Sequence, residues 1–319
     1  MTRSQRQSLA RAEGLWFEDC GLIIQADSTL FRVSRDFLAA RSPVFEGMLS
    51  LPAPRNADKM DGCPFVRLPD SAQDITVFLK ALLYSESFEP YPAPTTFTVI
   101  ASVLRMSHKY EVDALRKRAL AHLSAVHPTK LGRWTRLQTP LFLLPPQPVA
   151  LEIALLARQT SALWLLPIAL YRVCEYTHES DIIVGTNDGQ LGPVDQVACV
   201  KAIRWLETAG ASKILDFLWV PATIMGCFSL PSLRCQTSRM KARIVAETWR
   251  ESEPGTSALL PLTLWGEADW ERLEVCDTCL QAMKGAHAKA KQEIWNKLPE
   301  LFDLPPWTEL ERMKAEALR

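Results

Sequence analysis

Residues 31–49, FRVSRDFLAARSPVFEGML, constrain the fold of this chain more than any other stretch. They begin with β-favouring residues, and Ser34 then stands where a helix N-cap belongs. Apolar residues recur at helical spacing after it, and Pro43 directly after Ser42 suits the first position of a second helix with Ser42 as its cap. The stretch therefore predicts a strand that leads into two short consecutive helices.

The segments around this stretch extend the same pattern. Residues 21–34 favour two strands joined by a polar turn, and residues 65–70 favour a third strand. Ser71 then predicts the start of a helix, with Asp74 three residues on as an acidic variant of the capping box. Two further amphipathic helices follow, up to Pro128. A few strands followed by a run of helices indicate an α+β domain, with a small sheet flanked by helices.

The pattern divides the chain into three parts. Residues 1–14 are polar and predict a flexible leader, and residues 15–128 are the α+β domain. The strand signal fades after that domain, so residues 129–319 predict a mostly α-helical C-terminal region. This region shows no fixed repeat period, which argues against a solenoid. Its long helical stretches lie at residues 149–177, 194–219 and 272–298.

Charge and composition narrow the partners and the compartment. The 36 basic residues balance the 36 acidic ones, so we expect no direct binding to nucleic acid, which is typically marked by a basic stripe. The longest apolar stretch is interrupted by Pro167 and Arg172, which predicts no membrane span. The N-terminus lacks the apolar core of a secretion signal, so we expect reduced thiols and an intracellular protein of the cytoplasm, the nucleus or both.

No set of residues in the sequence has the pattern of a catalytic site. There is no Gly-x-Ser-x-Gly motif, and the five histidines have no evident nucleophile partner. We therefore predict that the protein is not an enzyme, with no cofactor and no small-molecule substrate. An enzyme remains a lower-ranked alternative, and it would require a pocket in the second half lined by converging polar groups.

One cysteine pair has the spacing of metal ligands. Cys276 and Cys279 are separated by two residues, and His287 lies eight residues further on. A structural zinc site normally needs four ligands, while the nearest other thiols, Cys227 and Cys235, are far apart from each other in the sequence. Two cysteines three residues apart on a helix share one face, so we expect a packing role. A zinc-stabilised helical scaffold with Cys276, Cys279 and His287 as ligands is the alternative.

Residues 15–128 resemble the BTB/POZ domain family. The resemblance lies in residues 17–49, 66–85 and 101–123, which follow the order of the family: a strand hairpin, a helical hairpin, a third strand and helices. Residues 38–45, LAARSPVF, are close to the most recognisable motif of the family. The lengthened hairpin, and the ending at residues 293–310, resemble the BTB proteins expanded in mushroom-forming fungi.

The resemblance also implies a charged pair, with one departure from the family pattern. Ser34 stands where the family usually has histidine, although serine can cap the following helix. In many BTB dimers, an Asp near the first strand and a basic residue after that histidine form a charged pocket at the dimer interface. The matching residues here are Asp19 and Arg35. The alternative is that both are ordinary surface residues, because surface charges are common and their pairs are weak.

The family resemblance implies a protein-interaction module. Such domains form a homodimer, or a heterodimer with another BTB protein, through the first helices, and several of the residues involved also serve the core of the domain. Some members bind a cullin as substrate adaptors of a ubiquitin ligase, and others act as transcriptional co-regulators. Neither kelch repeats nor zinc fingers are present in the sequence, so both roles stay open. The apolar interface candidates are Phe37, Leu38, Phe45, Met48 and Leu49.

Overall fold

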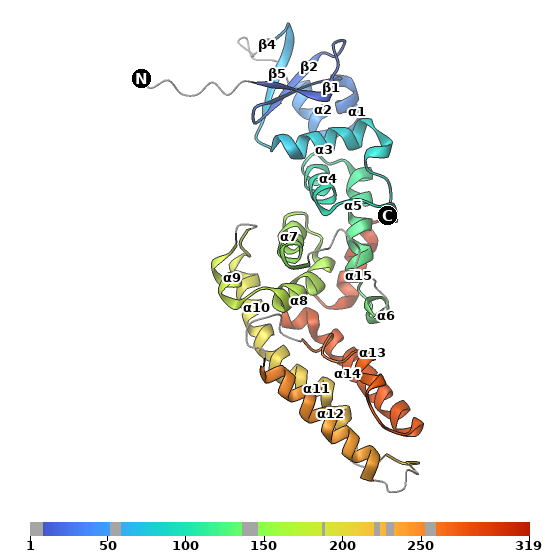
Figure 1. The fold of residues 1–319 in the computed structure, drawn as a ribbon. Coiled ribbons are helices and arrows are strands. Elements are labelled where there is room, and N and C mark those ends of the chain that lie inside the picture. The colour runs from blue at the N-terminus through green and yellow to red at the C-terminus, as the bar shows by residue number, and fades with distance from the viewer. Residues whose placement is uncertain are drawn as a thin grey trace.

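The computed structural model describes residues 9–51, 59–135, 146–186, 189–219, 224–227, 233–252 and 260–319. The molecule is elongated and curved, with a sheet at one end and helices running to the other (Figure 1). The strands are β1 (Ala10–Trp16), β2 (Leu22–Ala26), β3 (Thr29–Val33), β4 (Lys59–Met60) and β5 (Cys63–Leu68). The predicted fold class, an α+β domain followed by a mostly helical region, is confirmed.

The helices account for most of the described chain after the strands. In the N-terminal half they are α1 (Arg35–Arg41), α2 (Pro43–Ser50), α3 (Ala72–Leu83), η1 (Ser85–Ser87), α4 (Phe97–Lys109), α5 (Asp113–Val126), α6 (Leu131–Trp134) and α7 (Pro146–Gln159). After these come η3 (Leu163–Leu165), α8 (Leu166–Tyr176), α9 (Glu179–Val184), α10 (Pro193–Trp205), the π-helical turn η4 (Leu206–Gly210), α11 (Ala211–Leu215) and η5 (Asp216–Leu218). The last are α12 (Leu233–Ser252), α13 (Glu267–Glu271), α14 (Asp277–Leu301) and α15 (Trp307–Ala317).

The sheet is mixed, with the strand order β1-β3-β2-β5-β4. β2 and β3 form an antiparallel hairpin whose turn begins at Asp27, and β2 pairs with β5 in parallel. Asp27 has a φ of 47°, a left-handed conformation that aspartate tolerates better than most residues. Its carboxylate accepts a hydrogen bond from the N–H of Ala72 at 2.7 Å. The hairpin turn thereby also holds the first residue of α3.

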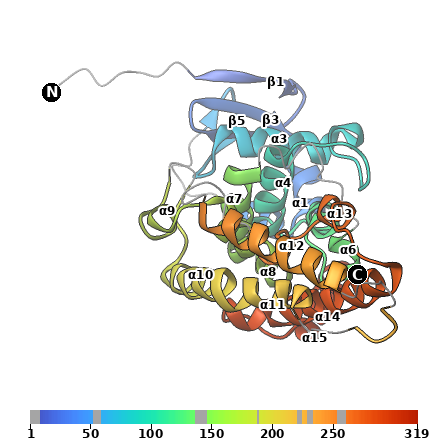
Figure 2. The same cartoon turned by 60° about the horizontal axis from the view of Figure 1, so that its bottom comes forward.

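The strand β1 replaces part of the leader predicted at residues 1–14. It pairs in parallel with β3 and lies at the edge of the sheet (Figure 2). The N–H of Ala10 donates to the carbonyl of Ser28 at 2.9 Å, and Leu15 is fully buried. An edge strand is held by backbone hydrogen bonds and can keep polar side chains. The polar sequence of β1 therefore gave no strand signal. Residues 1–8 of the predicted leader lie outside the described residues.

The two helix caps predicted in residues 31–49 are confirmed. The Ser34 hydroxyl accepts the N–H of Phe37 at 3.2 Å, and the Ser42 hydroxyl accepts the N–H of Phe45 at 3.1 Å. Ser42 is only 1% exposed, and its hydroxyl also donates to the backbone carbonyl of Tyr110, directly after α4. Ser42 therefore starts α2 and attaches it to α4, whereas Ser34 only starts α1.

The cap predicted at Ser71 is also confirmed, but its acidic partner has another role. The Ser71 hydroxyl accepts the N–H of Asp74 at 3.0 Å. Instead of reaching back to the cap, the Asp74 carboxylate accepts two hydrogen bonds from Nη1 of Arg105, each 2.8 Å long. The acidic residue thus joins α3 to α4.

The hydrophobic core continues from the sheet into the helical region without a break at residue 128. Trp164 is 1% exposed, and its indole N–H donates to the hydroxyl of Ser124 in α5 at 2.9 Å. At the C-terminal end, the rings of Trp295 and Trp307 stack 5.3 Å apart, and the Trp295 indole donates to the carbonyl of Thr129. The C-terminal helices therefore return to the end of α5 and pack beside it.

The caps at Ser34 and Ser42 predict two different energetic costs. Ser34→Ala removes only a cap and should lower the free energy of unfolding by about 1 kcal/mol. Ser42→Ala also leaves the buried Tyr110 carbonyl without its donor, so we expect a loss of about 2–3 kcal/mol. Urea unfolding followed by circular dichroism measures both. Equal losses in the two variants would contradict the additional role of Ser42.

Buried His127 predicts a loss of stability in acid. Its side chain is fully buried, and its Nδ1–H donates to the carbonyl of Leu123 at 3.1 Å. Burial lowers the pKa of His127 to about 3, and the positive charge of Arg172 adds to this effect. The hydrogen bond to Leu123 opposes the shift, and the charge of Lys314 adds a smaller contribution to it. In the unfolded chain the histidine pKa is about 6.5. Between about pH 3 and pH 6.5, the unfolded chain therefore binds a proton at His127 and the folded chain does not.

We expect the free energy of unfolding to fall as the pH drops below about 6.5, with about 2 kcal/mol lost through His127 by pH 5. Denaturant midpoints measured between pH 7 and pH 5 give this slope. His127→Gln should make it shallower by about one proton. His178→Gln, at an exposed position, is the matched control and should leave it unchanged. An unaltered slope in the His127 variant would refute the assignment.

Candidate functional site

The helical hairpin α1–α2 carries most of the residues predicted to form an interface. Arg35 is the first residue of α1 and is exposed, as is Asp19, which lies in the turn between β1 and β2. The guanidinium of Arg35 donates to the backbone carbonyl of Leu49 in α2. Both charged residues belong to the described part of the chain, and no ion pair joins them there. A charged contact between Asp19 and Arg35 of two chains stays a prediction.

The turn that carries Asp19 is held in place by Arg32. Its Nε donates to the carbonyl of Cys20 at 2.7 Å, and its Nη1 pairs with the carboxylate of Glu18 at 2.7 Å. The Trp16 indole N–H donates to the same Glu18 carboxylate, and the Arg32 guanidinium lies 5.9 Å from the centre of the Trp16 ring. These contacts hold both sides of the turn that carries Asp19.

The predicted apolar interface residues separate into two groups. Leu38 and Phe45 are each 1% exposed and belong to the core of the chain itself, where the Phe45 ring stacks on the Tyr110 ring at 4.5 Å. Phe37, Met48 and Leu49 are only partly buried and keep accessible apolar surface. The latter three are the residues able to contact another molecule without unfolding the domain.

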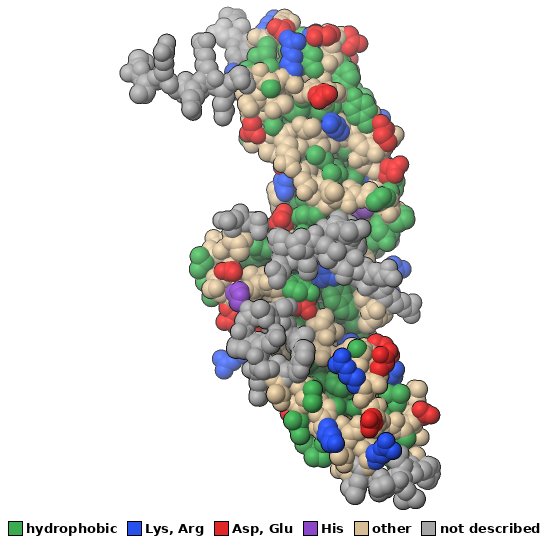
Figure 3. Space-filling model, in the orientation of Figure 1, with side chains coloured by type: hydrophobic (Ala, Val, Ile, Leu, Met, Phe, Trp, Pro, Cys, Tyr) green, Lys and Arg blue, Asp and Glu red, His purple; other side chains and the backbone are tan. Residues whose placement is uncertain are grey.

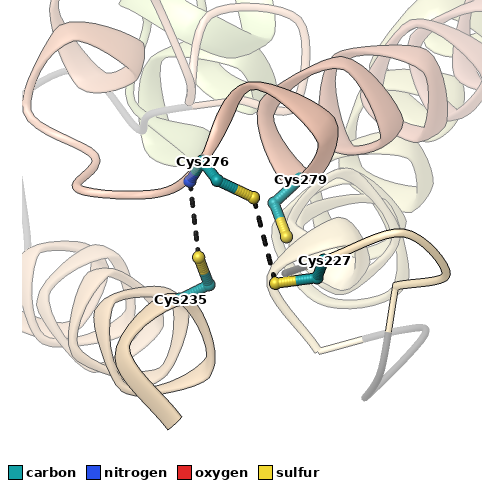
Figure 4. Close-up of side chains that lie close together, drawn as sticks. All are labelled: Cys227, Cys235, Cys276 and Cys279. Carbon is teal, nitrogen blue, oxygen red and sulfur yellow. Dashed lines mark hydrogen bonds between the residues drawn. The ribbon is translucent and has the colours of Figure 1, made fainter. Parts of the chain in front are cut away.

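A cluster of four cysteines lies in the helical region (Figure 4). Cys276 is the N-cap residue of α14, and Cys279 lies in its first turn. Cys227 ends the short described segment 224–227, and Cys235 is in the first turn of α12. The four Sγ atoms all lie within 4.8 Å of one another. Cys227 and Cys235, which are far apart from each other in the sequence, thus lie beside the predicted pair, because the fold brings distant residues together.

His287, the third predicted ligand, lies outside that cluster. Its ring packs edge-on against the rings of Phe217 and Trp270, with centroids 5.2 and 5.4 Å away. Burial, and to a smaller extent the charge of Lys291, lower the pKa of His287 to about 3, so the imidazole is neutral at pH 7. Its position among aromatic rings indicates a packing role.

Buried polar groups in the second half tie a turn to α8. The hydroxyl of Tyr171 accepts the N–H of Leu262 at 2.9 Å, and the hydroxyl of Thr263 donates to the Glu175 carboxylate at 2.7 Å. Burial raises the pKa of Glu175 above its ordinary value. Each of these contacts attaches the turn that begins at Leu260 to α8. These buried polar groups therefore have a structural role.

The charges on the surface are mixed. On the face drawn in Figure 3, basic and acidic side chains are interspersed among apolar ones, in keeping with the zero net charge of the sequence. Within the described ranges, no helix combines the length and the apolar character that a bilayer crossing requires.

Residues 16–126 match the family model for the BTB/POZ domain. The match lies inside the predicted bounds of 15–128 and runs from the last residue of β1 to the last residue of α5. No curated protein and no solved structure matches the chain. The similarity to the BTB proteins of mushroom-forming fungi stays a prediction, while the resemblance to the BTB/POZ family is confirmed.

Proposed function

Because residues 16–126 form a BTB/POZ domain, a domain of protein–protein interaction, we propose that the chain dimerises through α1 and α2 and holds a further partner on its helical region. The observation that carries this proposal is the accessible apolar surface of the helical hairpin. Phe37, Met48 and Leu49 contribute to it, and Leu51, directly after α2, is 70% exposed.

A second copy of the chain suits this surface. Stable interfaces bury roughly 800 Å² on each partner, with an apolar centre and a polar rim. The three half-buried side chains would form the centre, and Arg35 stands at its edge through its contact with Leu49. The chain has no net charge, so long-range repulsion does not oppose association.

The pairing of Asp19 with Arg35 of the second copy would add specificity more than affinity. Both side chains are exposed in one chain, where water screens their charges. Complementary charges at the rim of an interface fix the orientation of the partners and disfavour mismatched ones. The turn that carries Asp19 is held by Arg32, and the Arg35 guanidinium already contacts α2, so only the Asp19 side chain would have to be ordered when the pair forms.

Dimerisation is tested by light scattering of the full chain at tens of micromolar. Met48→Asp places a charge in the proposed apolar centre and should weaken the dimer at least about 100-fold. Ile183→Asp, at a 52% exposed position on α9, is the matched control and should leave the mass unchanged. The pair of changes Asp19→Asn and Arg35→Gln should weaken the dimer about 10-fold. A monomeric wild-type chain would refute the proposal, and an unchanged double variant would remove the charged pair from it.

Within this function we propose a role as a cullin-type substrate adaptor, with the BTB/POZ domain on the cullin and the helical region on the substrate. Transcriptional co-regulation is the competing role for a domain of this family. The elongated shape supports the adaptor role, because it separates the hairpin from the end of the helical region (Figure 1).

Affinity capture of the tagged full chain from its native cells distinguishes these roles. We expect a cullin among the captured proteins, and its recovery should survive Ile183→Asp. The full chain is the appropriate bait, because removal of residues 129–319 would expose the surface of α5 that Trp164 and Lys314 contact at Ser124. Capture of transcriptional regulators without any cullin would contradict the adaptor role and favour co-regulation.

A further inference from the structure

We propose that Cys227, Cys235, Cys276 and Cys279 bind one zinc ion as a structural tetrathiolate centre. The inference is independent of dimerisation and of the cullin. It rests on the positions of the four sulfur atoms, on the local structure that places them, and on the unusual composition of the buried side of α12.

The sulfur positions fit tetrahedral zinc. Zinc–sulfur bonds of about 2.3 Å in a tetrahedron place the sulfur atoms about 3.8 Å apart. The Sγ atoms of Cys276 and Cys227 are 3.8 Å apart, and no pair among the four exceeds 4.8 Å (Figure 4). A small contraction of the cluster would close the site around an ion. Four thiolates also form the complete ligand set of a closed structural zinc site, with no position left for water.

The start of α14 supplies half of the site. Cys276 precedes the helix and Cys279 lies in its first turn, so their two-residue separation directs both sulfur atoms to one place. The partial positive charge of a helix N-terminus favours the thiolate form of both residues. In addition, the N–H of Cys276 donates to the Sγ of Cys235 at 3.3 Å, a contact that orients a ligand from outside the metal shell.

The other half comes from two separate segments. Gly226 has a φ of 83°, a conformation that other residues adopt only with strain, and it turns the chain immediately before Cys227. A Cβ at Gly226 would lie 3.4 Å from Cγ2 of Thr278, so the turn rests directly on the start of α14. Cys235 enters from the first turn of α12 and is 4% exposed.

The charge around the cluster is suited to an anionic metal centre. Four thiolates and Zn²⁺ carry a net charge of about −2, which is costly to bury without a cation nearby. Arg239 lies one turn after Cys235, is 3% exposed, and donates from Nη2 to the carbonyl of Phe217 at 3.1 Å. Burial lowers the pKa of Arg239, whereas negative charge on Cys279, Cys235 and Cys227 raises it. Arg239 therefore lies where it can offset the thiolates.

The cluster differs from an ordinary packing pair elsewhere in the helical region. Cys174 and Cys199 are both buried in the core, with the Sγ of Cys174 3.8 Å from the carbonyl of Cys199. Both members of that pair are buried and contact each other, as expected for cysteines that only fill space in a core. The four-cysteine cluster instead includes Cys227 and Cys276, which are partly exposed and give an ion a route to the site.

The buried side of α12 explains why a metal would be needed there. Among its described side chains, the buried ones are Cys235, Arg239 and Arg243, spaced one turn apart along a single stripe. Apolar residues such as Ile244 and Val245 are instead 60% and 58% exposed. A helix whose buried stripe is largely arginine gains little from apolar burial, so coordination at Cys235 would supply the attachment to α14.

Metal analysis of the full chain, purified from cells grown with added zinc, tests the proposal. We expect inductively coupled plasma mass spectrometry to find about one zinc ion per chain. Replacement by Co²⁺ should produce the sulfur-to-cobalt charge-transfer band and the visible bands of a tetrahedral thiolate site. Serine at any one of the four positions should abolish the stoichiometric zinc, whereas Cys174→Ala and Cys63→Ser are matched thiol controls and should retain it.

Measurements on the wild-type chain keep the test decisive if the serine variants do not fold. Removal of zinc by a chelator should lower the Tm by roughly ten degrees, and added zinc should restore it. Zinc binds cysteine as thiolate, so metal binding must displace the thiol protons and should weaken as the pH falls.

Three results would overturn the proposal: a zinc-free wild-type chain that also takes up no Co²⁺, retention of zinc by all four serine variants, or a disulfide within the cluster in the freshly isolated protein. Stoichiometric iron in place of zinc would overturn the choice of metal.

Discussion

The buried hydroxyl of Ser42 is the contact on which the N-terminal domain depends. It caps α2 and donates to the carbonyl of Tyr110, so one side chain joins the helical hairpin to the end of α4. The Tyr110 ring then stacks with both Phe45 and Phe78, and its hydroxyl donates to the Asp70 carboxylate at 2.5 Å. The side of the hairpin that faces the core is fixed in this way, while Phe37, Met48 and Leu49 on α1 and α2 keep accessible apolar surface.

The helical region is a continuation of that domain. Trp164 contacts Ser124 from one side, and Lys314 of α15 reaches the backbone carbonyl of the same residue from another. These contacts hold the end of α5 between segments far apart in sequence. They also set the direction in which the helices extend away from the sheet (Figure 1). The elongated shape therefore separates the helical hairpin α1–α2 from the end of the helical region (Figure 1).

The interior beside α12 differs in composition from the rest of the core. The hydrophobic core reaches this end through Phe217, Trp265 and Trp270. The buried side chains described on α12 itself are instead Cys235, Arg239 and Arg243.

The candidate metal site could be predicted only in part. The spacing of Cys276 and Cys279 indicated two candidate ligands. His287 was included only because it is near them in the sequence, and it packs among aromatic rings instead. Cys227 and Cys235 have no local sequence pattern that links them to the pair.

The sequence by itself determined the elements that local chemistry controls. Caps at Ser34, Ser42 and Ser71, together with apolar periodicity, were sufficient to place the central strand hairpin and the main helices of the N-terminal domain. The family came from the resemblance of its ordered segments, which the family model then matched. Only the tertiary structure decided the rest: that Leu38 and Phe45 belong to the core, that residues 10–16 form a strand, and that four cysteines meet. Each of these depends on contacts between distant segments, for which a single sequence carries no periodic or capping signal.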